Sequence, residues 1–268
     1  MRSLGMGFPR MKSSLALTYR ESPLLRPLWR KLIGPPWVVS LLFYAAVATV
    51  RFVAFFSPWE MQHIFFLQTV AMWALPFIFL TRSGRREIGL TDQSPTFSSF
   101  LLSALAGAAC AVGFFVLGIA VFGDSPDNWC ISLRNYLHFD EMRGILPPAG
   151  LFALYALPAI FLNPIGEELL FRGFIQEAFA RKFNRWVGTA VSSVLFALVY
   201  LYLHGVWRDS AGFHLRGAST ALAVCLMSGV GVVFTVCRNR TQSLWPAMAA
   251  HAGFNLALLA SAIVQFAR

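Results

Sequence analysis

Two adjacent carboxylates and an arginine lie inside one of the most apolar stretches of the chain, where residues 166–173 read GEELLFRG. The charged side chains are those of Glu167, Glu168 and Arg172. Even on the mildest scales, a charged side chain at the centre of a lipid bilayer costs about 2.5–3.5 kcal/mol. Such groups therefore indicate catalysis, proton or ion handling, or a buried structural ion pair.

The spacing within this motif predicts different surroundings for the two carboxylates. Glu168 and Arg172 are four residues apart, so on a helix they face each other and can pair. Glu167 points about 100° away, because an α-helix has about 3.6 residues per turn. We therefore expect Glu168 to be neutralised and Glu167 to stay free, as suits a general base in a partly wet cavity. The alternative is a buried ion pair with one carboxylate at the water interface.

Three further polar side chains lie in other apolar segments. His251 and Asn255 are four residues apart and share one helix face. Imidazole can donate or accept a proton, and an amide can donate a hydrogen bond to a developing oxyanion. The pair could instead only join neighbouring helices. His204 is the strong acid/base candidate of the segment SSVLFALVYLYLHG, although a solvated histidine at a helix end is ordinary.

The composition predicts an all-α, polytopic membrane helical bundle. The chain of 268 residues is 57% hydrophobic and 13% charged, and its mean hydropathy is +0.62. A soluble domain has about 25% charged residues. The net charge of +10 does not indicate a nucleic-acid partner, because the basic residues cluster beside the apolar spans. Such clusters indicate membrane topology and contact with anionic lipid.

Seven apolar segments are close to the length of about 20 residues that a helix needs to cross a membrane. They are residues 37–57, 61–81, 97–122, 149–165, 187–204, 217–237 and 244–266; a total of seven to eight is expected. The arginines between the spans place the N-terminus in the cytoplasm and the acidic loop 123–147 outside. We expect this membrane to be a bacterial inner membrane.

We expect three consecutive parts along the chain. Residues 1–35 form a basic cytoplasmic or interfacial segment, residues 36–147 the first transmembrane helices with the outer loop, and residues 148–266 a catalytic core. Within that core, the segment 149–181 is too long for one straight crossing. Because proline removes a backbone donor, we predict a bend near Pro164.

The chain resembles the CPBP family (CAAX proteases and bacteriocin-processing proteins, also called the Abi family) over residues 148–262. The family consists of polytopic intramembrane endopeptidases. Its first motif, EExxxR, and its third, HxxxN, match in order at Glu167, Glu168, Arg172, His251 and Asn255. The resemblance implies a glutamate-activated water, with His251 and Asn255 stabilising the oxyanion or protonating the leaving amine. It also implies a membrane-anchored peptide or protein as substrate.

The chain departs from the family at the second motif, FxxxH. Ser192, Ser193 and Phe196 match, but Tyr200 occupies the histidine position and His204 follows one turn later. A shift of one turn moves a side chain about 5.4 Å. A zinc ion bound by two histidines is therefore less favoured than activation of water by a glutamate. A divalent metal such as zinc remains one of the two alternatives for the cofactor; the other is no cofactor.

Two other functions remain as alternatives to an intramembrane protease of glutamic or metallo type. The first is a non-proteolytic relative that binds a peptide or partner protein, as bacteriocin immunity or a scaffold would require; Tyr200 motivates it. The second is a small proton-coupled transporter that uses Glu167 and His251. The short loops and the lack of an internal repeat disfavour a transporter.

Overall fold

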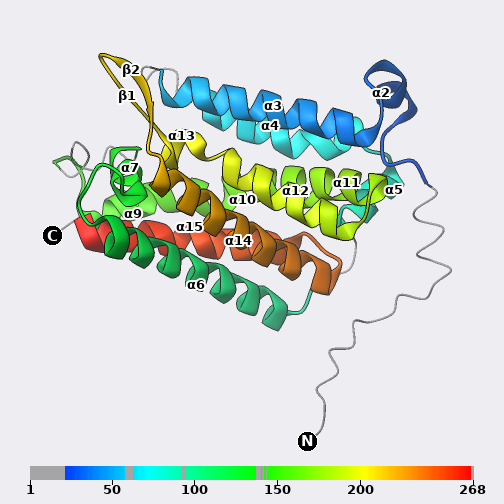
Figure 1. Cartoon of the computed structure of the whole chain (residues 1–268). Coiled ribbons are helices and arrows are strands. Elements are labelled where there is room, and N and C mark those ends of the chain that lie inside the picture. Colours follow the sequence, from blue (N-terminus) through cyan, green and yellow to red (C-terminus); the bar gives the residue numbers. More distant parts are fainter. Residues whose placement is uncertain are drawn as a thin grey trace, which may run out of the picture.

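The computed structural model describes residues 22–57, 63–91, 95–136, 140, 142 and 144–266, and these form an elongated bundle of helices (Figure 1). Its helices are α2 (Pro27–Leu32), α3 (Pro36–Phe55), α4 (His63–Phe79), α5 (Arg82–Glu87), α6 (Phe97–Phe122), α7 (Trp129–Tyr136), α9 (Pro148–Leu157), α10 (Asn163–Glu168), α11 (Gln176–Lys182), α12 (Arg185–Leu198), α13 (Leu201–His204), α14 (Ala218–Thr241) and α15 (Trp245–Phe266). Two π-helical segments, η2 (Pro158–Leu162) and η3 (Leu169–Ile175), interrupt the helix that carries the motif.

The lengths of the apolar helices confirm the predicted polytopic bundle. In the described part of the chain, five helices are long and apolar enough to cross a membrane: α3, α6, the continuous helix Pro148–Lys182, α14 and α15. Two shorter apolar helices, Ile64–Phe79 and Arg185–Leu198, correspond to the other two predicted spans. The chain is therefore an integral membrane protein. The division into three parts stays a prediction, and residues 1–21 of the first part lie outside the described residues.

The long motif helix runs from Pro148 to Lys182 without a break in helical structure. The helix has a π-helical segment that begins at Pro158, whereas Pro164, near which a bend was predicted, lies inside α10. A proline lacks the backbone donor of a regular turn, and the helix widens into η2 at this residue. The second widened segment, η3, directly follows Glu168. π-Helical turns inside α-helices are frequent at functional sites.

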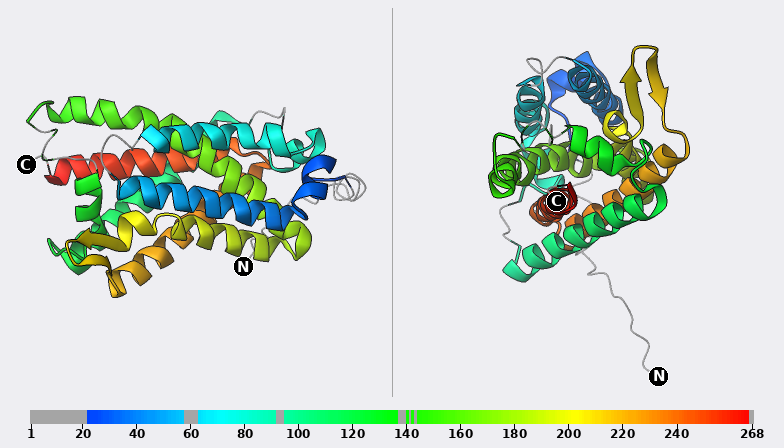
Figure 2. Two further views of the ribbon diagram at one scale, coloured as in Figure 1. Left: turned by 90° about the horizontal axis from the view of Figure 1, so that it is seen from above. Right: turned by 90° about the vertical axis from the view of Figure 1, so that its left-hand side faces the viewer.

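Helix α15 lies inside the bundle, and its closest neighbour is α6 (Figures 1 and 2). Glycines bring the two backbones together, because a Cβ atom at Gly107 would overlap the carbonyl group of Ala250. In the same way, a Cβ atom at Gly253 would overlap the carbonyl group of Ala104. Small residues at such crossings allow the close approach that stabilises helix pairs in membranes. This packing fixes the depth and rotation of His251, which is adjacent to Ala250.

We expect Gly107→Ala to lower the midpoint of thermal unfolding in detergent, because the added methyl group has to separate α6 from α15. Overpacking of this kind costs about 1–3 kcal/mol. The matched control is Gly113→Ala on the same helix, where a Cβ atom meets nothing within 4 Å. Alanine favours a helix over glycine by up to about 1 kcal/mol, so the control should unfold at the same temperature or higher. Equal midpoints for the two variants would contradict the glycine contact.

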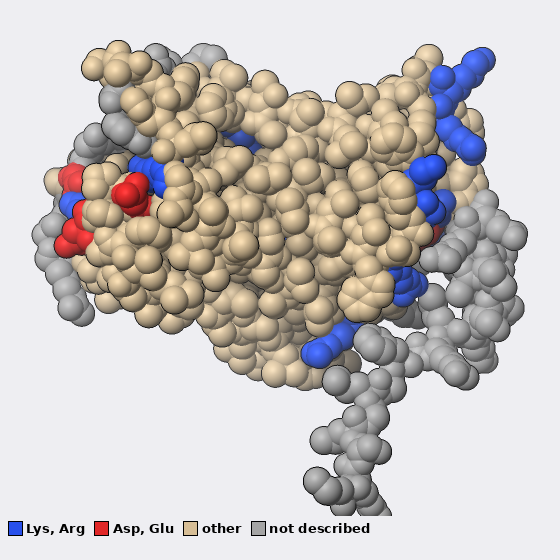
Figure 3. Space-filling view, viewed as in Figure 1, with Lys and Arg blue, Asp and Glu red and all other residues tan. Residues whose placement is uncertain are grey.

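Charged residues divide between the two ends of the bundle (Figure 3). The last turns of α2, α5, α11 and α14 bring Lys and Arg to one end, which we call the basic end; its residues include Arg30, Lys31, Arg85, Arg86, Arg181, Lys182, Arg238 and Arg240. The opposite end holds α7, and we call it the acidic end. Asp124 and Asp127 lie between α6 and α7, and Asp140 pairs with Arg134 of α7. This division supports the predicted orientation, which remains a prediction.

The loop between α13 and α14 contains a short antiparallel hairpin that the all-α expectation omitted. Strand β1 (Val206–Asp209) pairs with β2 (Gly212–Leu215), and Val206 lies opposite Leu215. Gly212 has a φ of +129°, which favours glycine at the turn. The hairpin extends from the same end of the bundle as α7 (Figure 1). The helical class of the bundle is unaffected.

Candidate active site

The carboxylate of Glu168 is held at the centre of the bundle by two partners. Arg172 Nη1 lies 3.0 Å from Glu168 Oε1, which confirms the pairing predicted from their spacing. His251 Nδ1 lies 2.8 Å from the same oxygen. All three side chains are almost fully buried. An ionised carboxylate can only accept a hydrogen bond, so this contact favours the form of the ring in which Nδ1 carries the proton and donates to Glu168 Oε1.

Glu167 is not the free carboxylate that its direction on the helix predicted. Arg51 Nη2 lies 2.8 Å from Glu167 Oε1, and the Tyr200 hydroxyl donates to both carboxylate oxygens at 2.9 and 2.8 Å. Glu167 has no measurable exposure, and only 3% of Arg51 is exposed. An ionised carboxylate removed from water needs partners of this kind. The expectation was wrong because it considered only the neighbours of Glu167 along its own helix.

Arg51 is the site residue that the motif analysis missed. It lies in the last turns of α3, far from every motif in sequence, and its guanidinium also stands 5.6 Å from the centre of the Tyr200 ring. The sequence signal for it was a charged residue, an arginine, inside the predicted span 37–57. An ionisable residue at such a position is a functional candidate with a partner to be found.

Tyr200, rather than His204, lies beside Glu167, as the register of the second motif indicates. His204 packs against the rings of Phe114 and Tyr200, with centroids 5.5 and 6.2 Å away. Its Nδ1 atom is buried and has no hydrogen-bond partner among the described residues. The structure therefore brings Glu167, Tyr200 and His251 together and leaves His204 one turn away on the wall of the same cavity.

The two residues of the third motif contact the two carboxylates and the π-helical segment η2. His251 Nε2 lies 3.9 Å from Glu167 Oε2, while its Nδ1 faces Glu168. Asn255 Nδ2 donates to the carbonyl oxygen of Ala159 in η2 at 2.9 Å. The His251 ring stacks on Phe234, with centroids 5.1 Å apart. The imidazole is thus fixed on three sides.

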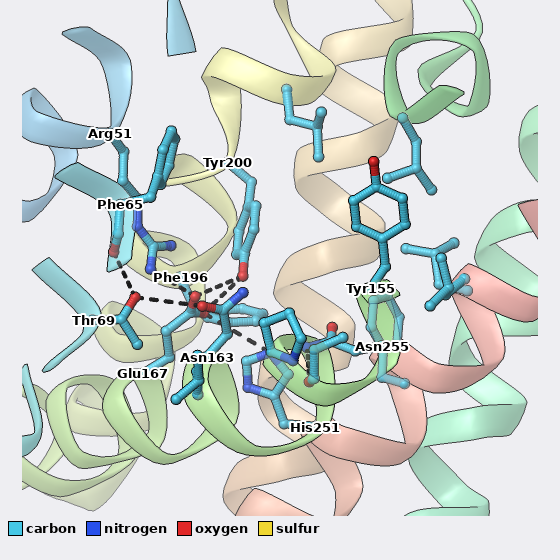
Figure 4. A pocket seen from close by; sticks show the side chains of 18 of the residues that line it. Arg51, Phe65, Thr69, Tyr155, Asn163, Glu167, Phe196, Tyr200, His251 and Asn255 are labelled. Atoms are coloured by element: carbon cyan, nitrogen blue, oxygen red, sulfur yellow. Dashed lines mark hydrogen bonds and ion pairs between the residues drawn. The ribbon is translucent and has the colours of Figure 1, made fainter. Parts of the chain in front are cut away.

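A cavity of about 310 Å³ borders these groups. Glu167, Tyr200, His251 and Asn255 lie on its wall, and Figure 4 shows Glu167 beside Arg51 and Tyr200, with Asn255 toward Tyr155. Glu168 and Arg172 are not among its described lining residues. The Arg172 guanidinium instead packs over the Phe196 ring, 4.1 Å from its centre. Glu167 and His251 therefore face the cavity, whereas Glu168 and Arg172 lie behind its wall.

The residues present do not fit a resident zinc ion. The described residues contain no group of three His, Cys, Asp or Glu side chains with metal-binding geometry. Zinc sites in proteins need at least three such ligands, and the two oxygens of Glu167 already hold Arg51 and Tyr200. A guanidinium at the place of a metal cation opposes binding by charge repulsion.

Fold and site together define a polytopic membrane protein with a buried acid/base centre that borders a cavity. Residues 149–257 match the family model described as type II CAAX prenyl endopeptidase Rce1-like. The match covers all three motifs and confirms the resemblance to the CPBP family over that segment. The matched model describes an endopeptidase, and it covers fewer than half of the residues of the chain. No curated protein and no solved structure matches the chain.

We expect His204→Ala to leave peptide cleavage within about threefold of the wild-type rate and to reduce stability by about 1–3 kcal/mol. The reason is that His204 contacts aromatic rings and not Glu167, so its loss leaves a cavity but keeps the acid/base groups. Rates in liposomes and thermal unfolding would be measured on the same preparations. A loss of cleavage without a loss of stability would instead give His204 the catalytic role that the sequence suggests.

We expect Tyr200→Phe to slow cleavage about 10- to 100-fold, because it removes the hydroxyl that donates to Glu167. Hydrogen bonds to charged groups contribute about 1.5–3 kcal/mol, which corresponds to that range of rates. The control is Tyr202→Phe, a neighbouring hydroxyl on the same wall. Unchanged rates in Tyr200→Phe would show that its hydroxyl has no part in the reaction.

Proposed function

We propose that this protein is an intramembrane endopeptidase in which Glu167 activates the attacking water. The observation that carries the proposal is a carboxylate on the cavity wall held between a cation and a hydroxyl donor, Arg51 and Tyr200. Both partners favour the ionised carboxylate, which is the form that can accept a proton. His251 stands on the other side, 3.9 Å from Glu167.

The proposed reaction begins when Glu167 takes a proton from water and the water oxygen attacks the carbonyl carbon of the peptide bond. The oxyanion that forms is stabilised by hydrogen-bond donors on the same wall. Asn255 has a second N–H beside the one bonded to Ala159, and His251 supplies Nε2 when protonated. The carbon–nitrogen bond then breaks, and the proton passes from Glu167 or His251 to the leaving amine.

Glu168 and Arg172 are positioning residues in this proposal. Glu168 holds Nδ1 of His251, so Nε2 points toward Glu167 and the cavity. Arg172 compensates the charge of Glu168 within a cage of aromatic rings formed with Phe196 and Phe234. The buried site therefore contains two carboxylates and two guanidinium groups, and its formal charges balance. His204 is proposed only to shape the cavity wall.

The proposed substrate is a membrane-anchored peptide or protein that enters laterally between helices. We propose a bacterial inner membrane with the N-terminus in the cytoplasm, as the basic end indicates. Anionic lipid would contact that end.

The test is a cleavage assay in liposomes with a library of membrane peptides and mass-spectrometric detection. Wild type is compared with Glu167→Gln and with Glu177→Gln. Glu177 is on the same long helix and pairs with Arg238 at 3.4 Å, away from the cavity. Cleavage by wild type and Glu177→Gln, but not by Glu167→Gln, would support the proposal.

A non-proteolytic binding protein is the second candidate, because both oxygens of Glu167 are occupied by side chains of the chain itself. It would be supported if wild type cleaves nothing in the library and Tyr200→His cleaves. In that case Tyr200 blocks an otherwise intact catalytic site, and Glu167→Ala should leave the biological effect of the protein unchanged.

A further inference from the structure

A second cavity, of about 290 Å³, lies at the basic end of the bundle, where Lys and Arg gather (Figure 3). Its lining residues come from the end of α4, from α5 with the loop after it, and from the start of α15. Three of them are Arg82, Arg85 and Arg86, and no Asp or Glu is among its described lining residues. It shares no described residue with the cavity beside Glu167. The proposed peptidase reaction therefore does not account for it.

The three arginines of this cavity lie on one face of α5. Arg85 and Arg86 follow Arg82 by three and four residues, and side chains at these spacings are neighbours on a helix. Like charges at such spacings repel each other and destabilise the helix. The one acidic residue of α5, Glu87, pairs with Arg181 of α11. An anion bound in the cavity would relieve the repulsion among the three arginines.

The guanidinium groups are suited to a phosphate. Arg82 is exposed, and its side chain makes no hydrogen bond or ion pair with any other described residue. Arg85 is oriented by the end of α4, because its Nη1 donates to the carbonyl oxygen of Leu80 at 3.2 Å and its guanidinium lies 5.6 Å from the centre of the Phe77 ring. A guanidinium presents a planar fork of donors that matches two oxygens of a phosphate.

The aromatic residues of the cavity indicate the source of the phosphate. Phe77 is 57% exposed and Trp245 is 43% exposed. Phe77 lies two residues before the end of α4, and Trp245 is the first residue of α15, so both are at ends of apolar helices. Tryptophan is enriched where helices leave the bilayer, and basic clusters at that level attract anionic lipid. Exposed apolar surface beside the arginines suits an acyl chain, for which a free phosphate has no use.

The two sides of the cavity are held together without a ligand. Leu244, next to Trp245, donates its backbone N–H to the carbonyl oxygen of Gly89 at 3.1 Å. Gly89 has a φ of +101°, and a Cβ atom there would lie 2.9 Å from the Leu244 nitrogen. Thr91 Oγ1, on the same wall, is buried and has no hydrogen-bond partner among the described residues. A hydroxyl can donate to a phosphate oxygen, so the cavity offers a preformed polar wall.

We propose that this cavity binds the phosphate group of an anionic phospholipid. The arginines of α5 hold the phosphate oxygens, and an acyl chain lies along Phe77 and Trp245. Such a site is more specific than general contact of the basic end with anionic lipid, and it is independent of the peptidase function. Because the lipid would connect α5 to the start of α15, its binding should raise the midpoint of thermal unfolding, as does any ligand that binds only the folded state.

The test compares three probes on the full chain in a nonionic detergent: dioleoylphosphatidylglycerol, dioleoylphosphatidylcholine and inorganic phosphate. The salt concentration is about 0.15 M, where attraction between distant exposed charges is screened. Binding is measured as the shift of the unfolding midpoint and, by native mass spectrometry, as the fraction of protein that retains a lipid. We expect phosphatidylglycerol to raise the midpoint and to stay bound, and the other two probes to do neither at the same concentration.

The variant Arg82→Gln/Arg86→Gln should bind phosphatidylglycerol at least about tenfold more weakly, because each hydrogen bond to a charged group contributes about that factor. The matched control is Arg30→Gln/Lys31→Gln on α2, which removes the same charge from the same end but does not alter the described wall of the cavity. Its affinity should stay within about twofold of wild type, since distant charges are screened.

Several results would overturn the proposal. Equal weakening in the two double variants would show a general attraction of the basic end for anions. Equal binding of phosphatidylcholine would remove the preference for an anionic lipid, and an equal shift by inorganic phosphate would show a site for free phosphate. If Arg82→Gln/Arg86→Gln does not fold, Arg82→Gln alone takes its place with Arg30→Gln as its control. Unchanged affinity in folded Arg82→Gln would then contradict the site.

Discussion

Replacement of Glu167 by glutamine is expected to reduce peptide cleavage by about 10²–10⁴-fold, the usual contribution of a general base. Glutamine has nearly the same shape and keeps an oxygen that can accept hydrogen bonds from Arg51 and Tyr200, the two partners of Glu167. It cannot take a proton from water. The structural change is therefore small, and the chemical change removes the proposed first step.

The size of the loss in cleavage rate distinguishes a general base from a residue that only stabilises the fold. Glu167→Gln keeps a hydrogen-bond acceptor for Arg51 but leaves the buried charge of Arg51 uncompensated. We expect it to fold in detergent with a loss of stability of about 3–5 kcal/mol. Its cleavage rate and its unfolding temperature would be measured on one preparation. A rate within tenfold of wild type, in a protein that folds normally, would exclude Glu167 as the base.

The positions of the spans could be predicted from the sequence, because the ability of a helix to cross a membrane depends mainly on its length and its apolar composition. The predicted span 97–122 coincides with α6, and 61–81 contains α4. The predicted span 187–204 instead divides at Tyr200, between α12 and α13. The hairpin after α13 was missed, because a pair of four-residue strands has little sequence signal beside long apolar helices.

The local part of the site was predictable, and its distant part was not. The pairing of Glu168 with Arg172 follows from a spacing of four residues on one helix. His251 contacts Glu168 more closely than Glu167 because of the way α15 packs against the motif helix. This packing cannot be inferred from the spacing of residues along the sequence. Arg51 is more than a hundred residues away from Glu167 in the chain, so only the packing of α3 reveals their pairing.

Replacement of Arg51 by methionine is expected to affect stability and activity together. The substitution keeps an unbranched apolar side chain but leaves Glu167 buried without its cation. Breaking a buried ion pair by removing one partner costs about 3–5 kcal/mol. To avoid this cost Glu167 would take up a proton, and a protonated carboxyl cannot act as the base. Cleavage should therefore fall by at least about 100-fold, within the contribution of a general base.

The double variant Arg51→Met/Glu167→Gln distinguishes an ion pair from a loss of packing. If the cost of Arg51→Met comes from the unpaired charge, removing that charge should recover most of the lost stability without recovering cleavage. Independent effects would instead add in the double variant. As a control, Arg134→Met on α7 breaks the partly exposed pair of Arg134 with Asp140, where about 0–1 kcal/mol is expected. A double variant less stable than Arg51→Met alone would show that Arg51 contributes packing and does not compensate the charge of Glu167.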